Sequence, residues 1–203
     1  SYETSFSVEV LKLLFDKQVE KVNSNENIPV QERGQLFSNL LYLIREGEND
    51  ASNLFEGNKQ IERFISNITA MEFKERLRAI NGFVFVIHSL AVGELKEKIS
   101  ELLKKTFEES KNEVFSESSI MFGLDLYNVG VLSETELMFV INKLKLKVDE
   151  HIKTGSTTSN YSIINEQLGK IKKEQLKGFE ETVEGVVKLK NAMKNSFKRF
   201  NEP

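Results

Sequence analysis

Apolar residues recur at steps of three and four along most of the chain, the spacing that lines one face of an α-helix. In residues 5–22 this spacing predicts a first helix, whose apolar positions include Val8, Leu11, Phe15, Val19 and Val22. The polar run 23–27 predicts a loop, because short polar side chains hydrogen-bond their own backbone. A second helix is expected from Pro29 to Gly47, and a short third helix through Ile65.

Residues 79–92 form the most apolar segment of the chain. Its dense β-branched and aromatic residues would suit a buried strand. A strand needs a partner for its backbone hydrogen bonds, however, and no other segment of the sequence offers one. We therefore expect an apolar helix at the centre of the core here.

Two short motifs predict where helices begin. Thr69–Glu72 and Ser133–Glu136 both match the capping box, in which a hydroxyl and a carboxylate three residues apart satisfy free amides at a helix start. Between them, the apolar positions over residues 95–107 predict an amphipathic helix. Another apolar segment extends over 114–132, with Gly130 as the expected C-terminal cap.

Residues 154–160 are all small and polar, which predicts a flexible loop. The longest periodic run of the chain follows, over residues 163–200, and predicts one helix of about 37 residues, or about 55 Å. Gly169, Gly178 and Gly185 each cost about 1 kcal/mol relative to alanine, so a helix bent near one of them is the alternative to an unbroken helix.

These patterns predict an all-α protein of seven or eight helices. We expect a single globular bundle closed by a long C-terminal helix; the alternative is a short stack of helix pairs of the HEAT or armadillo type. Only two prolines occur, which leaves long stretches free for helices. One domain over residues 1–203 is expected, with a helical core over 1–153 and the C-terminal helix over 160–203 as its subdivision.

Composition excludes several kinds of site and partner. There is no cysteine, so disulfides, thiolate metal sites and a cysteine nucleophile are excluded. The net charge of −3 gives no overall field to attract nucleic acid, and no nucleic-acid partner is expected. No apolar run reaches the roughly 18 residues that a membrane span needs. The absence of cysteine and of an initiator methionine favours a secreted or extracytoplasmic location slightly over a cytoplasmic one.

Catalytic and cofactor motifs are missing from the sequence. The two histidines, His88 in the apolar segment and His151 at the polar end of another helix, are too few for a zinc site. Neither has a glutamate three residues before it, as dimetal sites in bundles do. No phosphate-binding loop or dinucleotide fingerprint occurs. We therefore expect no catalytic residue, no metal and no cofactor, and a protein that is not an enzyme.

The final helix carries the one candidate binding surface. Basic side chains flank its apolar stripe, and such a helix can lie on an acidic membrane surface or in a partner's groove. They are Lys188, Lys190, Lys194, Lys198 and Arg199. The simpler interpretation, which we favour, is that the stripe only closes the core. We expect a non-enzymatic helical interaction protein that binds a protein partner; a helical carrier of a lipid or small apolar ligand is the alternative.

Overall fold

The computed structural model describes residues 59–87, 93–113 and 115–200, together with six helical positions near the amino terminus: Leu13, Asp16, Lys17, Glu20, Lys21 and Ser24. Five of these positions lie in the helix expected over 5–22. The sixth, Ser24, is helical although the run 23–27 was expected to form a loop, and its hydroxyl donates to the carbonyl of Glu20 at 2.6 Å. The rest of the first helix and the helix expected from Pro29 to Gly47 lie outside the described residues. His88 and the rest of the apolar segment to residue 92 lie outside them too.

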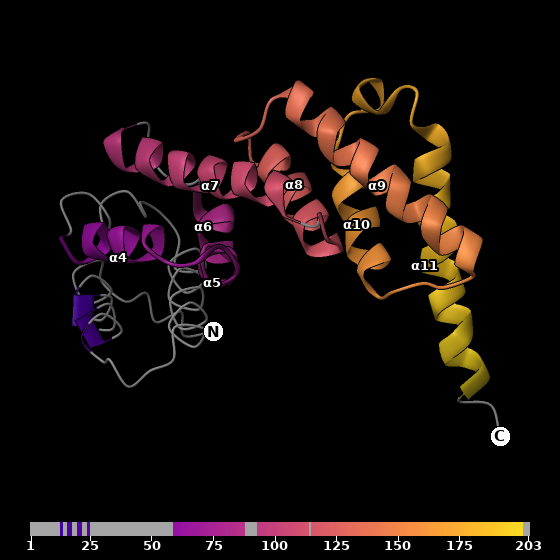
Figure 1. The fold of residues 1–203 in the computed structure, drawn as a ribbon, viewed down its shortest axis with the longest axis horizontal. Coiled ribbons are helices and arrows are strands. Elements are labelled where there is room, and N and C mark those ends of the chain that lie inside the picture. Colours follow the sequence, from indigo (N-terminus) through magenta and orange to yellow (C-terminus); the bar gives the residue numbers. More distant parts are fainter. Residues whose placement is uncertain are drawn as a thin grey trace, which may run out of the picture. The chain divides into compact units, whose positions relative to one another are not determined.

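The chain is all-α, since every regular element in the described ranges is a helix, and the helices pack against one another (Figure 1). It divides into two compact units, residues 1–109 and 110–203. The loop at 154–160, expected to separate a core from the C-terminal helix, lies inside the second unit.

Besides the six amino-terminal positions, the described part of the first unit contains three short helices and most of a long one. They are α4 (Lys59–Thr69), α5 (Phe73–Ala79), α6 (Asn81–Val86) and α7 (Glu94–Asn112). α6 confirms that the apolar segment begins as a helix and not a strand, and its Phe83 is fully buried. A turn at Ile80 separates α5 from α6. α7 confirms the expected amphipathic helix, with a buried face formed by Ile99, Leu102, Leu103 and Phe107.

The capping box expected at Thr69 is wrong. Thr69 is the last residue of α4, and its hydroxyl donates to the carbonyl of Ile65 at 2.8 Å. α5 begins after Glu72, and no side-chain hydrogen bond caps it there. Because Thr69 still belongs to α4, its backbone is helical, whereas the N-cap of a capping box has a non-helical backbone.

The second unit is a bundle of four helices and one 3₁₀ turn. They are α8 (Glu117–Asn128), α9 (Glu134–Thr154), α10 (Asn160–Gly169), η2 (Lys173–Leu176) and α11 (Glu180–Phe200). α8 and α11 each pack against both α9 and α10 (Figure 1). The core between them is apolar, and its fully or nearly fully buried members include Leu124, Leu137, Leu144, Val148, Ile164 and Val186.

Both ends of α9 lie where local sequence signals place them. The capping box at Ser133 is confirmed: the Glu136 amide donates to the Ser133 hydroxyl at 3.3 Å, and the Ser133 amide donates to the Glu136 carboxylate at 2.7 Å. Gly155 ends the helix with φ of 67°, a left-handed conformation that favours glycine. α9 is therefore a well-terminated helix of 21 residues.

The single helix expected over residues 163–200 is wrong. The chain leaves the helix after Gly169, makes the 3₁₀ turn η2, and enters α11 only at Glu180. Gly178 has φ of 90°, which no residue in a continuous helix adopts, and Lys177 before it is extended. The apolar periodicity survives the break because Leu168, Ile171 and Leu176 are still buried. α11 nevertheless closes the unit as expected, since it packs on α9 and α10.

Candidate functional site

The basic residues expected to form a surface are all on α11, and Lys188 and Lys190 flank its buried stripe. Lys188 and Lys190 lie one residue before and after Leu189, which is 5% exposed, so helical geometry places them on opposite sides of it. Lys188 and Lys194 are exposed and Lys190 is half-buried. The side chains of Lys198 and Arg199 lie outside the part that the structure describes. α11 thus uses at least part of its apolar stripe to close the bundle.

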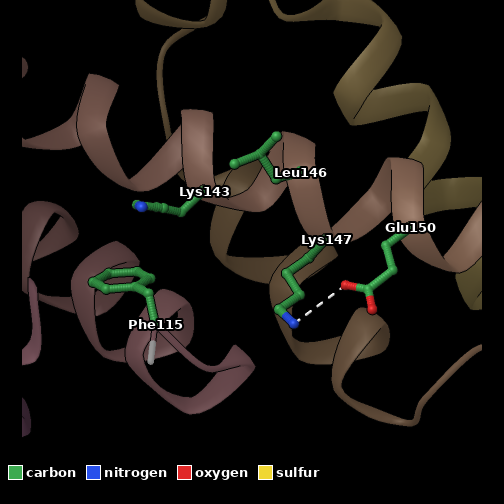
Figure 2. A pocket seen from close by; sticks show the side chains of 5 residues that line it. All are labelled: Phe115, Lys143, Leu146, Lys147 and Glu150. Carbon is green, nitrogen blue, oxygen red and sulfur yellow. Dashed lines mark hydrogen bonds and ion pairs between the residues drawn. The ribbon is translucent and has the colours of Figure 1, made fainter. Parts of the chain in front are cut away.

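A pocket of about 220 Å³ lies beside α9 (Figure 2). Four of its lining residues share one face of α9, at steps of three and four: Lys143, Leu146, Lys147 and Glu150. The fifth is Phe115, from the segment that precedes α8. We call this site the α9 pocket. It lies away from the buried face of α9, which carries Leu137, Val140, Ile141, Leu144 and Val148.

The α9 pocket combines a fixed aromatic ring with an exposed apolar side chain. Phe115 is 8% exposed and meets Phe139 of α9 edge to face, with ring centroids 5.3 Å apart. Leu146 is 64% exposed, the highest value among the large apolar residues that the structure describes. Sequence reasoning missed Leu146. Leu146 lies two residues after Leu144 and two before Val148, so it does not share their buried helix face. An apolar residue outside the helical period was the sequence signal that could have identified it.

Two lysines and one glutamate line the α9 pocket. The ammonium groups of Lys111 and Lys143 lie 5.2 and 5.4 Å from the centroid of the Phe139 ring, within range of a cation–π interaction. Lys147 pairs with Glu150 at 3.3 Å. Within the described ranges, no carboxylate pairs with Lys143. The pocket wall therefore presents more basic than acidic groups.

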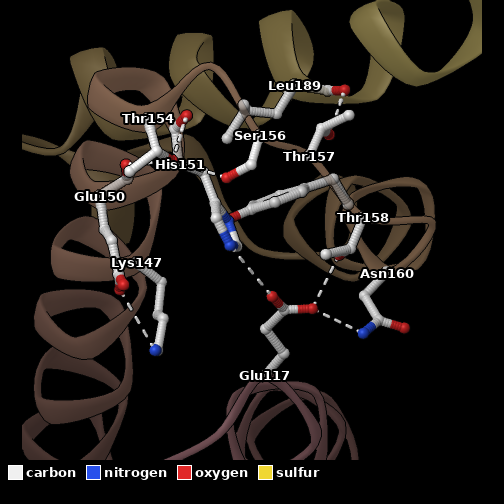
Figure 3. Close-up of polar contacts among 11 residues, drawn as sticks. Glu117, Lys147, Glu150, His151, Thr154, Ser156, Thr157, Thr158, Asn160 and Leu189 are labelled. Carbon is white, nitrogen blue, oxygen red and sulfur yellow. Dashed lines mark hydrogen bonds and ion pairs between the residues drawn. The ribbon is translucent and has the colours of Figure 1, made fainter. Parts of the chain in front are cut away.

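A second cluster, which we call the Glu117 junction, ties three elements together (Figure 3). The Glu117 carboxylate, in the first turn of α8, accepts hydrogen bonds from Thr158 at 2.8 Å and Asn160 at 2.6 Å. Its other oxygen lies 3.6 Å from Nε2 of His151 in the last turn of α9. Nδ1 of His151 lies 2.5 Å from the hydroxyl of Tyr161 in α10. Most of these groups are shielded from solvent, and Tyr161 is fully buried.

Burial and the neighbouring carboxylate restrict where protons can lie in the Glu117 junction. Burial raises the pKa of Tyr161, and the charges of Glu117 and Glu150 raise it further. The hydroxyl therefore keeps its proton at neutral pH. Nε2 of His151 faces the Glu117 carboxylate, which only accepts, so in a singly protonated ring the proton lies on Nε2 and the Tyr161 hydroxyl donates to Nδ1. A buried phenol with a raised pKa is a poor nucleophile, so the arrangement favours a structural role over a catalytic one.

The loop at 154–160, expected to be flexible, is held by side-chain hydrogen bonds at three positions. Besides Thr158 and Asn160, Thr157 donates to the carbonyl of Leu189 in α11 at 2.8 Å. The sequence placed His151 at a helix end but did not link it to Glu117, Thr158, Asn160 or Tyr161. These partners are brought together by packing of α8, α9 and α10, and no local spacing signals that.

Across the residues that the structure describes, no three histidine, aspartate or glutamate side chains are grouped to hold a metal ion. No described helix is both long and apolar enough to cross a membrane. No family model, curated protein or solved structure matches the chain. Function must therefore be inferred from the α9 pocket and the Glu117 junction themselves.

Proposed function

We propose that this protein acts by binding another protein, and that the partner docks over the α9 pocket of the second unit. The observation that carries the proposal is Leu146, a large apolar side chain 64% exposed beside a pocket with the Phe115 ring in its wall. Aromatic and apolar groups at the centre of a patch with a polar rim are the anatomy of protein interfaces. Lys143, Lys147 and Glu150 supply such a rim.

The α9 pocket is built on rigid elements, which supports this role. α9 buries its opposite face in the core and is capped at both ends. Phe115 directly precedes Ser116, the N-cap of α8, whose hydroxyl accepts from the Ser119 amide at 3.3 Å. The Glu117 junction then joins the start of α8 to the end of α9. A site preorganised in this way loses little conformational entropy when a partner binds.

The size of the pocket fits a side chain better than a small molecule. Its volume of about 220 Å³ lies below the range of about 300–1,000 Å³ typical of small-molecule sites. An apolar side chain from a docked protein would cover Leu146 and Phe115, and the partner's flanking residues would meet the rim. The partner then removes from water the apolar surface that α9 exposes.

Photo-crosslinking tests this proposal. A benzoylphenylalanine replaces Leu146 in the full chain, and in a matched control it replaces Ile163 of α10, which is 49% exposed. In the cells that produce the protein, we expect position 146 to give a discrete protein adduct that position 163 does not give.

Three results would weigh against it. Equal adducts at both positions would indicate unspecific contact, and no adduct at either would remove the proposed interface. A lipid mass attached to position 146, or a lipid retained by the protein in native mass spectrometry, would instead favour a carrier.

A further inference from the structure

The geometry points to the chemistry of the partner: we propose that the segment docking in the α9 pocket is acidic. Its carboxylates face Lys143 and Lys147, and one apolar side chain inserts between Phe115 and Leu146. This inference rests on the proposed function and adds the charge and anchor of the partner to it.

Lys143 is the first reason to expect a carboxylate. Its ammonium lies 5.4 Å from the centroid of the Phe139 ring, and no carboxylate pairs with it among the residues that the structure describes. An ammonium has three donors, and an aromatic ring attracts its charge without supplying a lone pair for them. Lys143 is half-buried, and its N–H donors have no carboxylate partner among the described residues. A carboxylate oxygen of a partner would form the strongest hydrogen bonds with them.

Lys147 and Lys111 give the second reason. Lys147 is paired with Glu150, but their side chains are 33% and 60% exposed, and pairs in such a setting contribute little and exchange readily. Lys111 brings another positive charge to the same Phe139 ring. The pocket lining itself holds two lysines and one glutamate, which would repel a basic segment and attract an acidic one.

The apolar residues of the pocket and the length of this α9 face indicate how many apolar anchors the partner segment carries and how long it is. The pocket has room for about one large side chain, and its apolar contacts are Phe115 and Leu146. The face of α9 from Phe139 to Glu150 is about 16 Å long. An acidic segment of about three helical turns, with one apolar anchor near its middle, matches both features.

A peptide selection on the full chain tests this inference without a known partner. A random-peptide phage library is panned against the immobilised protein, and the selected peptides are synthesised. Their affinities are then measured for the wild type and four variants. Lys143→Glu/Lys147→Glu and Leu146→Asp alter the α9 pocket. Lys145→Glu, whose side chain lies on another face of α9, and Ile163→Asp on α10 are the matched controls. Circular dichroism verifies that each variant keeps its helical content.

We expect the selected peptides to carry net negative charge around an aliphatic or aromatic residue. Both pocket variants should weaken their binding by about tenfold or more, the controls should leave it unchanged, and added salt should weaken it. Peptides that require Leu146 but are neutral or basic would overturn the acidic segment and leave the proposed interface standing. A selection that yields only peptides indifferent to Leu146, or no peptide at all, would overturn both.

Discussion

Replacing Gly185 by alanine would place a methyl group against α9 at the point where α11 crosses it. A Cβ at position 185 would lie 2.5 Å from Cγ1 of Val148 and 3.4 Å from Cδ1 of Ile152. Val148 is 1% exposed, and a β-branched side chain in a helix has essentially one rotamer, so it cannot turn away. The two helices must therefore separate locally for the substitution to fit.

The magnitude follows from two opposing terms. Overpacking of a filled core costs about 1–3 kcal/mol, whereas alanine gains about 1 kcal/mol over glycine as a helix former. We expect Gly185→Ala to lower the free energy of unfolding by up to about 2 kcal/mol. Guanidinium unfolding followed by circular dichroism measures it.

Gly169→Ala is the matched control, because nothing lies within 4 Å of a Cβ built there in α10. It should leave stability unchanged or raise it by up to about 1 kcal/mol. Adding Val148→Ala should cost less in the Gly185→Ala background than in the wild type, since the clash is then gone. If Gly185→Ala is as stable as Gly169→Ala and shows no coupling to position 148, the packing of α11 on α9 described above is incorrect.

Three further changes probe the second unit. Ser133→Ala should cost about 1 kcal/mol in unfolding experiments through loss of the α9 cap, whereas Thr135→Ala, in the exposed first turn, should cost less; equal losses would contradict the cap. Burial raises the pKa of Asp125, so its contribution to stability is present below its unfolded pKa and is lost as pH rises through the folded value. The stability of the wild type relative to Asp125→Asn should therefore fall with rising pH across the carboxyl range, and a flat difference would contradict it. Nitrogen NMR should find neutral His151 protonated at Nε2, with Tyr161→Phe shifting the Nδ1 signal; an Nδ1-protonated ring would refute the assignment of the hydrogen bonds.

The sequence predicted correctly those helix ends that depend only on neighbouring residues. The Ser133 capping box and the end of α9 at Gly155 depend only on residues within one turn. The same motif failed at Thr69 because that residue is still helical, as the last residue of α4, and α5 begins only after Glu72. The long helix failed because the buried residues keep a helical period although the backbone turns at Gly178. Apolar periodicity reports burial, and it does not report whether the helix is continuous.

The site was harder to predict because its parts are distant in sequence. Leu146 and the lysines beside it lie on one helix. The sequence could have identified Leu146 as an apolar residue that falls off the buried face of that helix. Phe115 reaches the α9 pocket only through the packing of the segment before α8. Glu117 and Asn160 are 43 residues apart, and nothing in their local sequence links them. The expected basic surface on α11 was inferred without knowledge that α9 and α10 cover part of that helix.

Amide shift mapping on the full chain tests most directly whether protein ligands bind at the α9 pocket. The nitrogen-labelled protein is titrated with a peptide from the selection above. We expect the largest shifts at Phe115 and over residues 139–150 of α9. Shifts concentrated instead on residues 188–194 of α11, with α9 unmoved, would contradict the α9 pocket as the docking site.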